Sequence, residues 1–342
     1  MKIVEYSNEM RPRWDAYVMQ HEQATLFHLI VWQRIIARSF GYKPLYLAAV
    51  EGDEIRGVLP LFMVSNPLTG RTLISTPFAV YGGVCSSDPA AHDALIAEAT
   101  RLAHEEKVEY LELRLRESDP STDFQVKELY VSFDTAIDPD PERLVKALPR
   151  DTRYMIRKGQ KAGLRATRGN NQVDTFYEIY AQSVRNLGTP VFAKKFFRII
   201  LEELGDAAEI SVIWKGDTAV ASVLSFRFRD WILPYYGGST LDGRSCAANN
   251  FMYWELLESA RQRGIRNFDF GRSKLGTGSY SFKSDWNMRQ RPLPYQFCLV
   301  KRREMPNFSP ANPRFKRVTE LWKRIPFPLT KVIGPALVKL FP

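Results

Sequence analysis

The sequence predicts an α/β protein built from two copies of one structural unit. Helical and strand-like segments alternate, and 342 residues suit two domains that each bury a core. Three landmarks recur in the same order, offset by about 155 to 165 residues: Gly52-Asp53 with Gly216-Asp217, Tyr81-Gly82-Gly83 with Tyr236-Gly237-Gly238, and Leu113-Arg114 with Gly271-Arg272. Such elements also recur by chance in α/β proteins, but their ordered recurrence favours a duplication.

The first half is expected to open with helices and continue as a hairpin, because Gly52-Asp53 is a turn signal. Its expected helices are 13–21, 31–38 and 90–107, and its expected strands are 45–50, 55–64, 108–115 and 124–133. A segment rich in proline and aspartate at 137–142 is the predicted linker. The resulting domains are 1–136, 137–302 and a tail at 303–342.

The second half repeats this order. A long helix is expected at 174–186 and 193–204, interrupted at Gly188 and Pro190. The expected strands are 209–214, 219–227, 231–238 and 265–270, with a helix at 250–263.

The chain has a formal net charge of +10, which favours an anionic partner such as nucleic acid, a nucleotide-linked substrate or an acidic membrane. Its three cysteines are far apart, which argues against a disulfide framework and a structural zinc site. The four histidines lack metal-ligand spacing. No signal core and no apolar run of about 18 residues is present, so the expected location is the cytoplasm.

A basic stripe is the strongest electrostatic signal. Its members recur every three or four residues and would share one helix face: Lys146, Arg150, Arg153, Arg157 and Lys161. Arginine binds phosphate through two parallel hydrogen bonds, so an anion is expected across this face. The alternative is a solvated surface helix with acidic neighbours, and the phosphate interpretation is slightly favoured.

The segment 268–286 predicts a strand that leads into a loop rich in glycine and serine. It matches neither a P-loop nor a dinucleotide-binding fingerprint. Lys283, between Phe282 and Trp286, is expected either to bind a carboxylate or polarise a carbonyl, or to pack its stem on the two rings. Asp269 is a candidate general base, although a role in capping the loop is favoured.

The tail carries two apolar helical stripes with basic residues around them: Val318, Leu321, Trp322 and Ile325, then Leu329, Val332, Ile333, Ala336, Leu337, Leu340 and Phe341. Such helices lie in membrane interfaces or dock on their own domain, and both interpretations stay open.

Several motifs together resemble the FemAB family, which has two GNAT-type (N-acetyltransferase-like) domains. They are Phe27 with Trp32, 148–158 with 161–163, Tyr236-Gly-Gly-Ser239, Phe268-Asp-Phe-Gly271 and Phe282-Lys283. The resemblance covers residues 1 to 300 and is closest to the subgroup associated with exosortase and PEP-CTERM systems.

The resemblance implies an acyltransferase that transfers an acyl or aminoacyl group to an amine of a cell-envelope or exopolysaccharide precursor, without a metal or redox cofactor. Charged tRNA would be the donor, and the acceptor would carry phosphate. Lys283 and Asp269 are the catalytic candidates. The substrate-binding candidates are Arg153 and Arg157 on acceptor phosphates, Tyr236 in the acceptor channel, and Arg272, Phe282 and Trp286. The long helical arm of some relatives is absent.

Two other functions compete with this one. An acyl-CoA-dependent N-acyltransferase usually needs a glycine cradle, and the equivalent segment 244–250 has no glycine. A non-enzymatic scaffold would use the stripe and tail at the inner face of the membrane. The copies are also unequal: the first has only Glu112, Arg114 and Arg116 where the second has the glycine-rich loop. We therefore expect a cleft between the copies with its chemistry mostly from the second.

Overall fold

The computed structural model describes residues 1–306 and 313–342, with the side chains of 313–318 excepted. The chain divides into two compact units. Unit 1 contains Met1–Tyr130 with residues 292–306 and 339–342, and unit 2 contains Val131–Arg291 with residues 313–338.

Two long strands set these boundaries. β9 (Gln125–Ala136) crosses from unit 1 into unit 2, so the boundary lies six residues before the expected one at 136/137. β15 (Arg289–Leu299) returns the chain to unit 1, because its residues from Tyr295 to Leu299 pair antiparallel with β8. The expected third part at 303–342 is therefore divided between the two units.

Unit 1 holds two sheets, in the strand orders β1-β3-β4-β7 and β15-β8-β6-β5-β2. Its strands are β1 (Lys2–Glu5), β2 (Lys43–Pro44), β3 (Leu47–Glu51), β4 (Glu54–Leu59), β5 (Phe62–Asn66), β6 (Gly70–Ile74), β7 (Cys85–Ser86) and β8 (Tyr110–Arg114). Its helices are α1 (Arg11–Gln20), α2 (Ile30–Phe40) and α3 (Pro89–Glu105). The single strand expected at 55–64 is two strands, because Pro60 cannot donate a ladder hydrogen bond.

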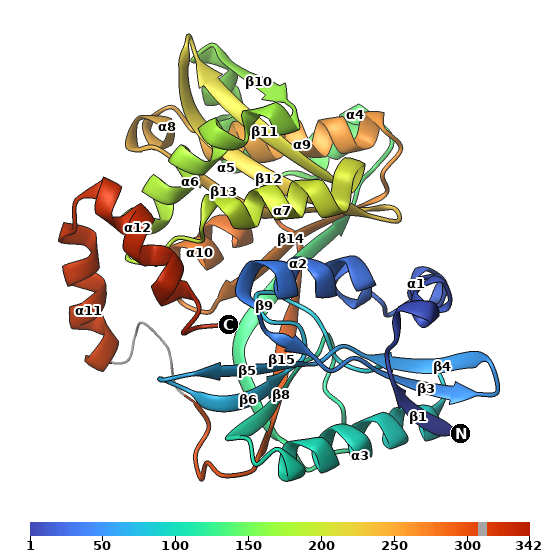
Figure 1. The fold of residues 1–342 in the computed structure, drawn as a ribbon. Coiled ribbons are helices and arrows are strands. Elements are labelled where there is room, and N and C mark those ends of the chain that lie inside the picture. The colour runs from blue at the N-terminus through green and yellow to red at the C-terminus, as the bar shows by residue number, and fades with distance from the viewer. Residues whose placement is uncertain (307–312) are drawn as a thin grey trace. The chain divides into compact units, whose positions relative to one another are not determined.

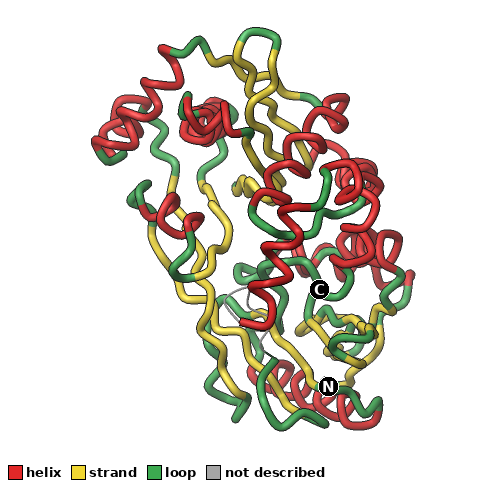
Figure 2. The backbone as a smooth tube through the Cα atoms, turned by 90° about the vertical axis from the view of Figure 1, so that its left-hand side faces the viewer, coloured by secondary structure: helices red, strands yellow, loops and turns green. Residues whose placement is uncertain are grey.

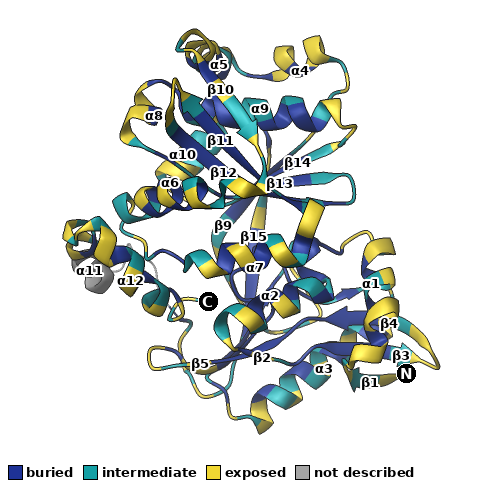
Figure 3. Cartoon of the chain, turned by 45° about the horizontal axis from the view of Figure 1, so that its top comes forward, coloured by how far each residue is buried: buried dark blue, intermediate teal, exposed yellow. Residues whose placement is uncertain are grey.

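Unit 2 is a twisted sheet in the order β10-β11-β12-β13-β14, continued by β9, with helices on both faces (Figures 1 and 2). Its further strands are β10 (Leu164–Arg168), β11 (Ala208–Lys215), β12 (Thr218–Phe228), β13 (Trp231–Ser239) and β14 (Asn267–Lys274). Its helices are α4 (Pro141–Ala147), α5 (Arg150–Lys161), α6 (Val173–Asn186), α7 (Lys194–Leu204), α8 (Leu241–Ser245), α9 (Ala248–Gln262), α10 (Gly278–Ser284), α11 (Pro313–Arg324) and α12 (Phe327–Val338). The strands β11 and β12 are almost fully buried (Figure 3).

The hairpins of the two units are alike. β3 and β4 meet at a two-residue turn with φ +59° at Gly52, and β11 and β12 meet at one with φ +58° at Gly216. Both hairpins carry a register shift shortly before the turn, at Ala49/Val50 and Ile213/Trp214. In each unit a helix then leads to a parallel strand pair, β6 with β8 and β13 with β14. The expected α/β fold with a repeated unit is confirmed.

One of the three landmarks is not structurally equivalent. Tyr236-Gly237-Gly238 lies in β13, whereas Tyr81-Gly82-Gly83 lies in a tightly packed loop. A Cβ atom at Gly82 would lie 1.8 Å from Oγ1 of Thr76, so this glycine allows close packing that no other residue fits.

Candidate active site in the second unit

The parallel pair β13 and β14 separates soon after it forms. Only Trp231 and Ile232 of β13 are in register with β14, opposite Asn267 and Phe268. Beyond this point β14 bends at Gly271, which has φ +72°, a conformation that residues with a Cβ atom rarely adopt. The bend exposes two successive carbonyl groups to α10, the short helix that follows.

Lys283 of α10 closes onto this bend. Its Nζ donates hydrogen bonds to the carbonyl oxygens of Gly271 and Arg272, at 3.2 and 3.0 Å. The ammonium group also lies 5.4 Å from the centre of the Phe270 ring. The side chain is partly exposed along its length, but its nitrogen is enclosed by these groups. The sequence expectation placed Phe282 and Trp286 around this lysine and missed Phe270, which belongs to the quoted Phe-Asp-Phe-Gly motif.

The charge state of Lys283 is unusual. The pKa of its amine is lowered to about 7, chiefly by desolvation; the Asp269 charge opposes this decrease, and the Arg272 charge adds to it. A neutral lysine amine has two N–H donors and one lone pair. Because two carbonyl oxygens use both donors, the lone pair of neutral Lys283 points in the remaining tetrahedral direction. The same direction carries an N–H donor when the group is charged, so Lys283 can accept a proton and return it.

Asp269 is a buried residue of β14, only 4% exposed. Its Oδ1 accepts a hydrogen bond from the backbone N–H of Gly271 at 2.7 Å. The carboxylate therefore stabilises the bend and raises the pKa of Lys283 through its charge. This geometry agrees with the favoured capping role, while general-base activity stays a prediction.

Tyr236 and Arg272 stand on the two strands that separate. Tyr236 is 7% exposed and lies among aromatic rings of α6, α7, the segment between them, β12 and β13: Tyr180, Phe192, Phe196, Phe197, Phe226 and Tyr235. Its hydroxyl has no hydrogen-bond partner in the described structure. Desolvation raises the pKa of this phenol well above its usual value, and the Arg272 charge opposes the increase. Arg272 thus acts electrostatically on both Tyr236 and Lys283.

Phe282 and Trp286 belong to an aromatic cluster beside the bend. Phe282 is partly buried, and Trp286 is 2% exposed. Their ring centres lie 6.0 and 5.6 Å from that of Phe270, and Tyr253 of α9 completes the cluster. The cluster fixes α10 on β14. Direct substrate contact by either residue stays a prediction. The one observation that favours it for Trp286 is that its buried Nε1 has no hydrogen-bond partner in the described structure.

The basic stripe is divided between two helices, which corrects the expectation of one face. Lys146 lies in α4, which ends at Ala147, and α5 begins at Arg150. Pro149 separates them because the residue before a proline is driven to extended conformation, and Leu148 has ψ 140°. Lys146 is paired with Glu142, as the surface alternative expected.

Arg153 and Arg157 remain on α5; Arg153 is partly exposed and Arg157 is exposed. α5 is tied to the end of α10, because the Thr152 hydroxyl donates to the Asp285 carbonyl oxygen. Arg153 is thus next in sequence to Thr152, which contacts Asp285, two residues after Lys283. Among the described residues, neither Arg153 nor Arg157 forms an ion pair with a carboxylate. Their binding of acceptor phosphates stays a prediction.

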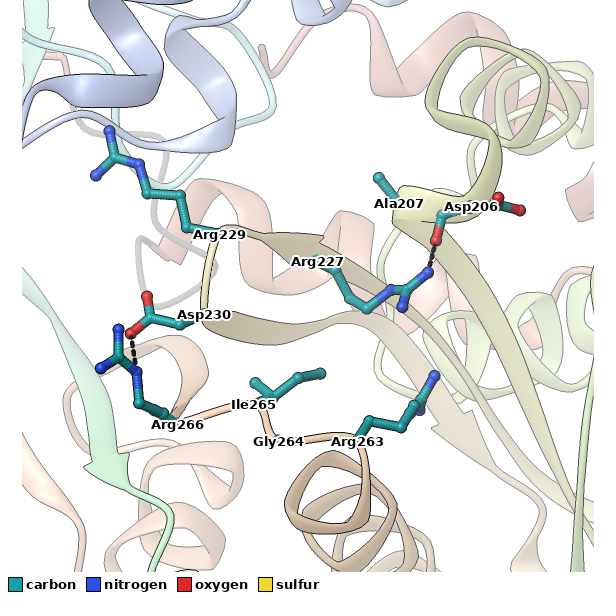
Figure 4. A pocket seen from close by; sticks show the side chains of 9 residues that line it. All are labelled: Asp206, Ala207, Arg227, Arg229, Asp230, Arg263, Gly264, Ile265 and Arg266. Atoms are coloured by element: carbon teal, nitrogen blue, oxygen red, sulfur yellow. Dashed lines mark hydrogen bonds and ion pairs between the residues drawn. The ribbon is translucent and has the colours of Figure 1, made fainter.

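Unit 2 also contains an open polar pocket of about 620 Å³, whose lining does not include Lys283. Figure 4 shows the residues that line it. It lies where β13 and β14 begin, about 20 Å from Arg272 at the usual strand rise of ~3.3 Å per residue. Its lining includes four arginines: Arg227, Arg229, Arg263 and Arg266. Arg266 pairs with Asp230, Arg263 with Glu209, and Arg227 donates to the Asp206 carbonyl. These arginines thus connect neighbouring segments of the fold, and we do not assign acyl transfer to this pocket.

In acyl-CoA enzymes a glycine cradle for phosphate usually precedes the helix that corresponds to α9, and the sequence argued against such a cradle here. A one-turn helix, α8, precedes α9, and Ala247 adopts φ +60°. A Cβ atom at Gly243 would lie 2.3 Å from the Val220 carbonyl oxygen, so this glycine serves packing on β12. Among the described residues, no group of three or more metal-ligating side chains is placed to hold a metal ion. In the same part of the chain, every helix is too short or too polar to span a bilayer.

In the sequence alignment of the two halves, Arg272 corresponds to Arg114 of unit 1. Arg114 ends β8 and is 3% exposed. Its guanidinium donates to Glu112 at 2.8 Å and to the carbonyl oxygens of Thr76, Ala79 and Pro342. The guanidinium of Arg114 therefore holds neighbouring loops together.

Comparisons with known proteins concern residues 147–284 and the fold. Residues 147–284, which include α5 through Lys283, match the family model described as an acetyltransferase (GNAT) domain. A search of curated proteins found no significant match.

Solved structures resemble most of the chain. The crystal structure of FemX has 16% sequence identity and a TM-score of 0.65 over 88% of this chain and 98% of its own. The C-terminal domain of a putative lysylphosphatidylglycerol synthetase from Agrobacterium fabrum has 11% identity and a TM-score of 0.57, over 86% and 92%. A tandem GNAT protein from the clavulanic acid biosynthesis pathway has 12% identity and a TM-score of 0.55, over 89% and 99%. The chain therefore has the expected tandem GNAT-like fold.

Proposed function

We propose that this protein is an acyltransferase that transfers an acyl or aminoacyl group to an amine, with Lys283 as its proton shuttle. The observation that carries the proposal is the position of the Lys283 amine, held by the Gly271 and Arg272 carbonyl oxygens beside the point where β13 and β14 separate. The GNAT-domain match over 147–284 ends just after this lysine and supports an acyltransferase.

The chemistry needs one base and one positioned acyl donor. The acceptor amine attacks the acyl carbonyl carbon, a C–N bond forms, and the bond from that carbon to the leaving oxygen or sulfur breaks. The amine loses a proton to neutral Lys283, which then gives a proton to the leaving group and becomes neutral again. A pKa of about 7 suits both transfers near neutral pH. The Arg272 charge and the charged form of Lys283 favour the negative oxygen of the tetrahedral intermediate.

The substrates we propose are those that the FemAB resemblance implies. The donor is an aminoacyl-tRNA, and the acceptor is a phosphate-bearing precursor of the cell envelope or of an exopolysaccharide, in the manner of the exosortase and PEP-CTERM subgroup. Arg153 and Arg157 would bind the acceptor phosphates, since both residues lie on α5, which Thr152 ties to the residue that follows α10. In this proposal the positive charge of the chain binds the anionic donor and acceptor, and no metal or redox cofactor takes part.

The test separates proton transfer from charge. Purified protein is incubated with tRNA charged with radioactive amino acids and with a UDP-linked muropeptide, and label in the acceptor is counted. We expect Lys283→Met and Lys283→Arg both to lose at least about a hundredfold in turnover, because arginine keeps the charge but cannot give up its proton. Unchanged turnover in Lys283→Arg would rule out the proton-shuttle role. If wild-type protein transfers no label to the acceptor, the proposed function is refuted.

An acyl-CoA donor is the second candidate, because the family model over 147–284 is that of acetyltransferases. The segment before α9 argues against it, since Gly243 is packed on β12 and Ala247 carries a Cβ atom. Calorimetric titration with acetyl-CoA decides between the donors. Saturable binding with transfer of labelled acetyl groups would favour this candidate over charged tRNA.

A further inference from the structure

The exposed face of α12 is more apolar than the face that α12 buries. Its outward residues follow helical spacing, and all of them are apolar: Pro328, Leu329, Val332, Ile333 and Ala336. Leu329 is 51% exposed, Val332 is 76% and Ile333 is 41%. The buried residues are Thr330, Gly334 and Val338. A surface helix of a globular protein normally has the opposite arrangement.

The buried face is nonetheless fitted to unit 2, so this orientation is specific. A Cβ atom at Gly334 would lie 2.9 Å from the backbone nitrogen of Val191, which means that only glycine allows the approach. Nζ of Lys331 binds both carboxylate oxygens of Glu178 in α6, at 2.9 and 2.8 Å. Arg185 of α6 donates to the Ile325 carbonyl oxygen just before α12. These contacts hold the helix with its apolar residues outward.

We infer that this apolar face, Leu329, Val332, Ile333 and Ala336 with Leu321 of α11, inserts into the interface of an anionic membrane. Leu321 of the preceding helix is also apolar and 65% exposed. Contiguous exposed apolar residues mark sites for a partner or a membrane. The charge of the surrounding sequence selects between the two.

Residues 321–342 contain four basic residues, Lys323, Arg324, Lys331 and Lys339, and no aspartate or glutamate. Lys323 pairs with Glu320 and Lys331 with Glu178, so the net positive charge of this segment comes from Arg324 and Lys339. Two copies of a chain with net charge +10 repel each other, whereas an anionic lipid surface attracts such a chain. α12 has only 12 residues and contains Pro335, so it is too short to cross a bilayer and suits an orientation in the plane of the interface.

The test uses the full-length protein and two kinds of vesicle, one of phosphatidylcholine alone and one with about 30% phosphatidylglycerol, an anionic lipid fraction high enough to attract basic segments. We expect flotation with the anionic vesicles, weakened by salt and reduced at least about tenfold by the double variant Leu329→Asp/Val332→Asp. The matched control is Val145→Asp/Leu241→Asp, which changes two exposed apolar residues of α4 and α8 and should float like wild type. All variants are first compared by circular dichroism and thermal unfolding.

A second measurement tests insertion directly. Val332→Trp adds a fluorophore on the exposed face to the seven tryptophans of the chain. The difference between the emission spectra of the variant and of wild type should shift to shorter wavelength when anionic vesicles are added. Absence of flotation and of the spectral shift would overturn the inference. Sedimentation that shows a dimer abolished by Leu329→Asp/Val332→Asp, without flotation of wild type, would assign the face to a second copy and also overturn it. Neither result depends on transfer activity.

Discussion

The pKa of Lys283 is the property on which the proposed chemistry rests. A decrease from 10.5 to about 7 corresponds to roughly 5 kcal/mol of difference between the two protonation states, at ~1.4 kcal/mol per pKa unit. About half of the Lys283 amines would then be neutral at pH 7, against about one in three thousand for an ordinary lysine. We therefore predict that Lys283 reacts with acylating reagents at a pH where other lysines are protected.

Competitive labelling measures this property residue by residue. The protein is treated briefly with trace acetic anhydride between pH 5 and 10, and labelling of the Lys283 peptide is followed by mass spectrometry. Each curve is normalised to its own plateau, so that limited access to the amine does not alter the midpoint. The exposed Lys215 supplies an internal reference in the same digest. We expect a midpoint near 7 for Lys283.

Two charge variants test the physical cause with opposite signs. Asp269→Asn removes a charge that raises the Lys283 pKa but keeps an oxygen that accepts from the Gly271 N–H, so the midpoint should fall. Arg272→Gln removes a charge that lowers the pKa, so the midpoint should rise. A wild-type midpoint near 10, or shifts in the reverse directions, would refute the assignment of this lysine as a proton shuttle.

Three further predictions concern stability and binding. His28 is buried and its pKa is lowered to about 4, chiefly by desolvation, so the folded state disfavours its protonation. The free energy of unfolding in urea at fixed temperature should therefore fall by up to about 3 kcal/mol as pH decreases from about 6.5 to 4. The control is His28→Gln, and wild-type stability that changes no more with pH than that of this variant would contradict the prediction. Gly82→Ala should destabilise unit 1 by about 1–3 kcal/mol, because the new methyl group would collide with Thr76, and an unchanged melting temperature would show that the loop yields. The double variant Arg153→Gln/Arg157→Gln should weaken binding of a UDP-linked muropeptide at least about tenfold in calorimetry, whereas Arg244→Gln, another exposed arginine of unit 2, should not; equal effects would indicate attraction by net charge alone.

The repeated architecture was predictable because its signals are local. Glycine turns with alternating strands around them identify hairpins, and the hairpins of both units are present with the same turn and the same kind of register shift. The Tyr-Gly-Gly landmark did not identify equivalent positions, because the same three residues adopt different backbone structures in the two units. Close packing on Thr76 explains it in one unit, and a strand position explains it in the other.

The candidate site was predictable only in part. The sequence indicated Lys283, Asp269 and Gly271, since glycine and a lysine between aromatic residues are local features. It gave no sign that Phe270 would lie beneath the ammonium group or that two carbonyl oxygens would bind it, because both depend on how β14 bends. A single basic helix was expected from the sequence because the basic residues recur at helical spacing. Pro149 drives Leu148 to an extended conformation and so divides the segment into two helices. The expected cleft between the copies stays a prediction.

The buried guanidinium of Arg114 has a consequence for how the two halves can change over time. In unit 1 this arginine holds loops together, and in unit 2 the corresponding strand presents Arg272 beside a titrating amine. After a duplication, selection on one half would then act through folding and on the other through chemistry. A library of random substitutions scored separately for abundance and for activity should therefore split by half: losses at Arg114 would follow abundance, and losses at Arg272 would occur in protein that still accumulates normally.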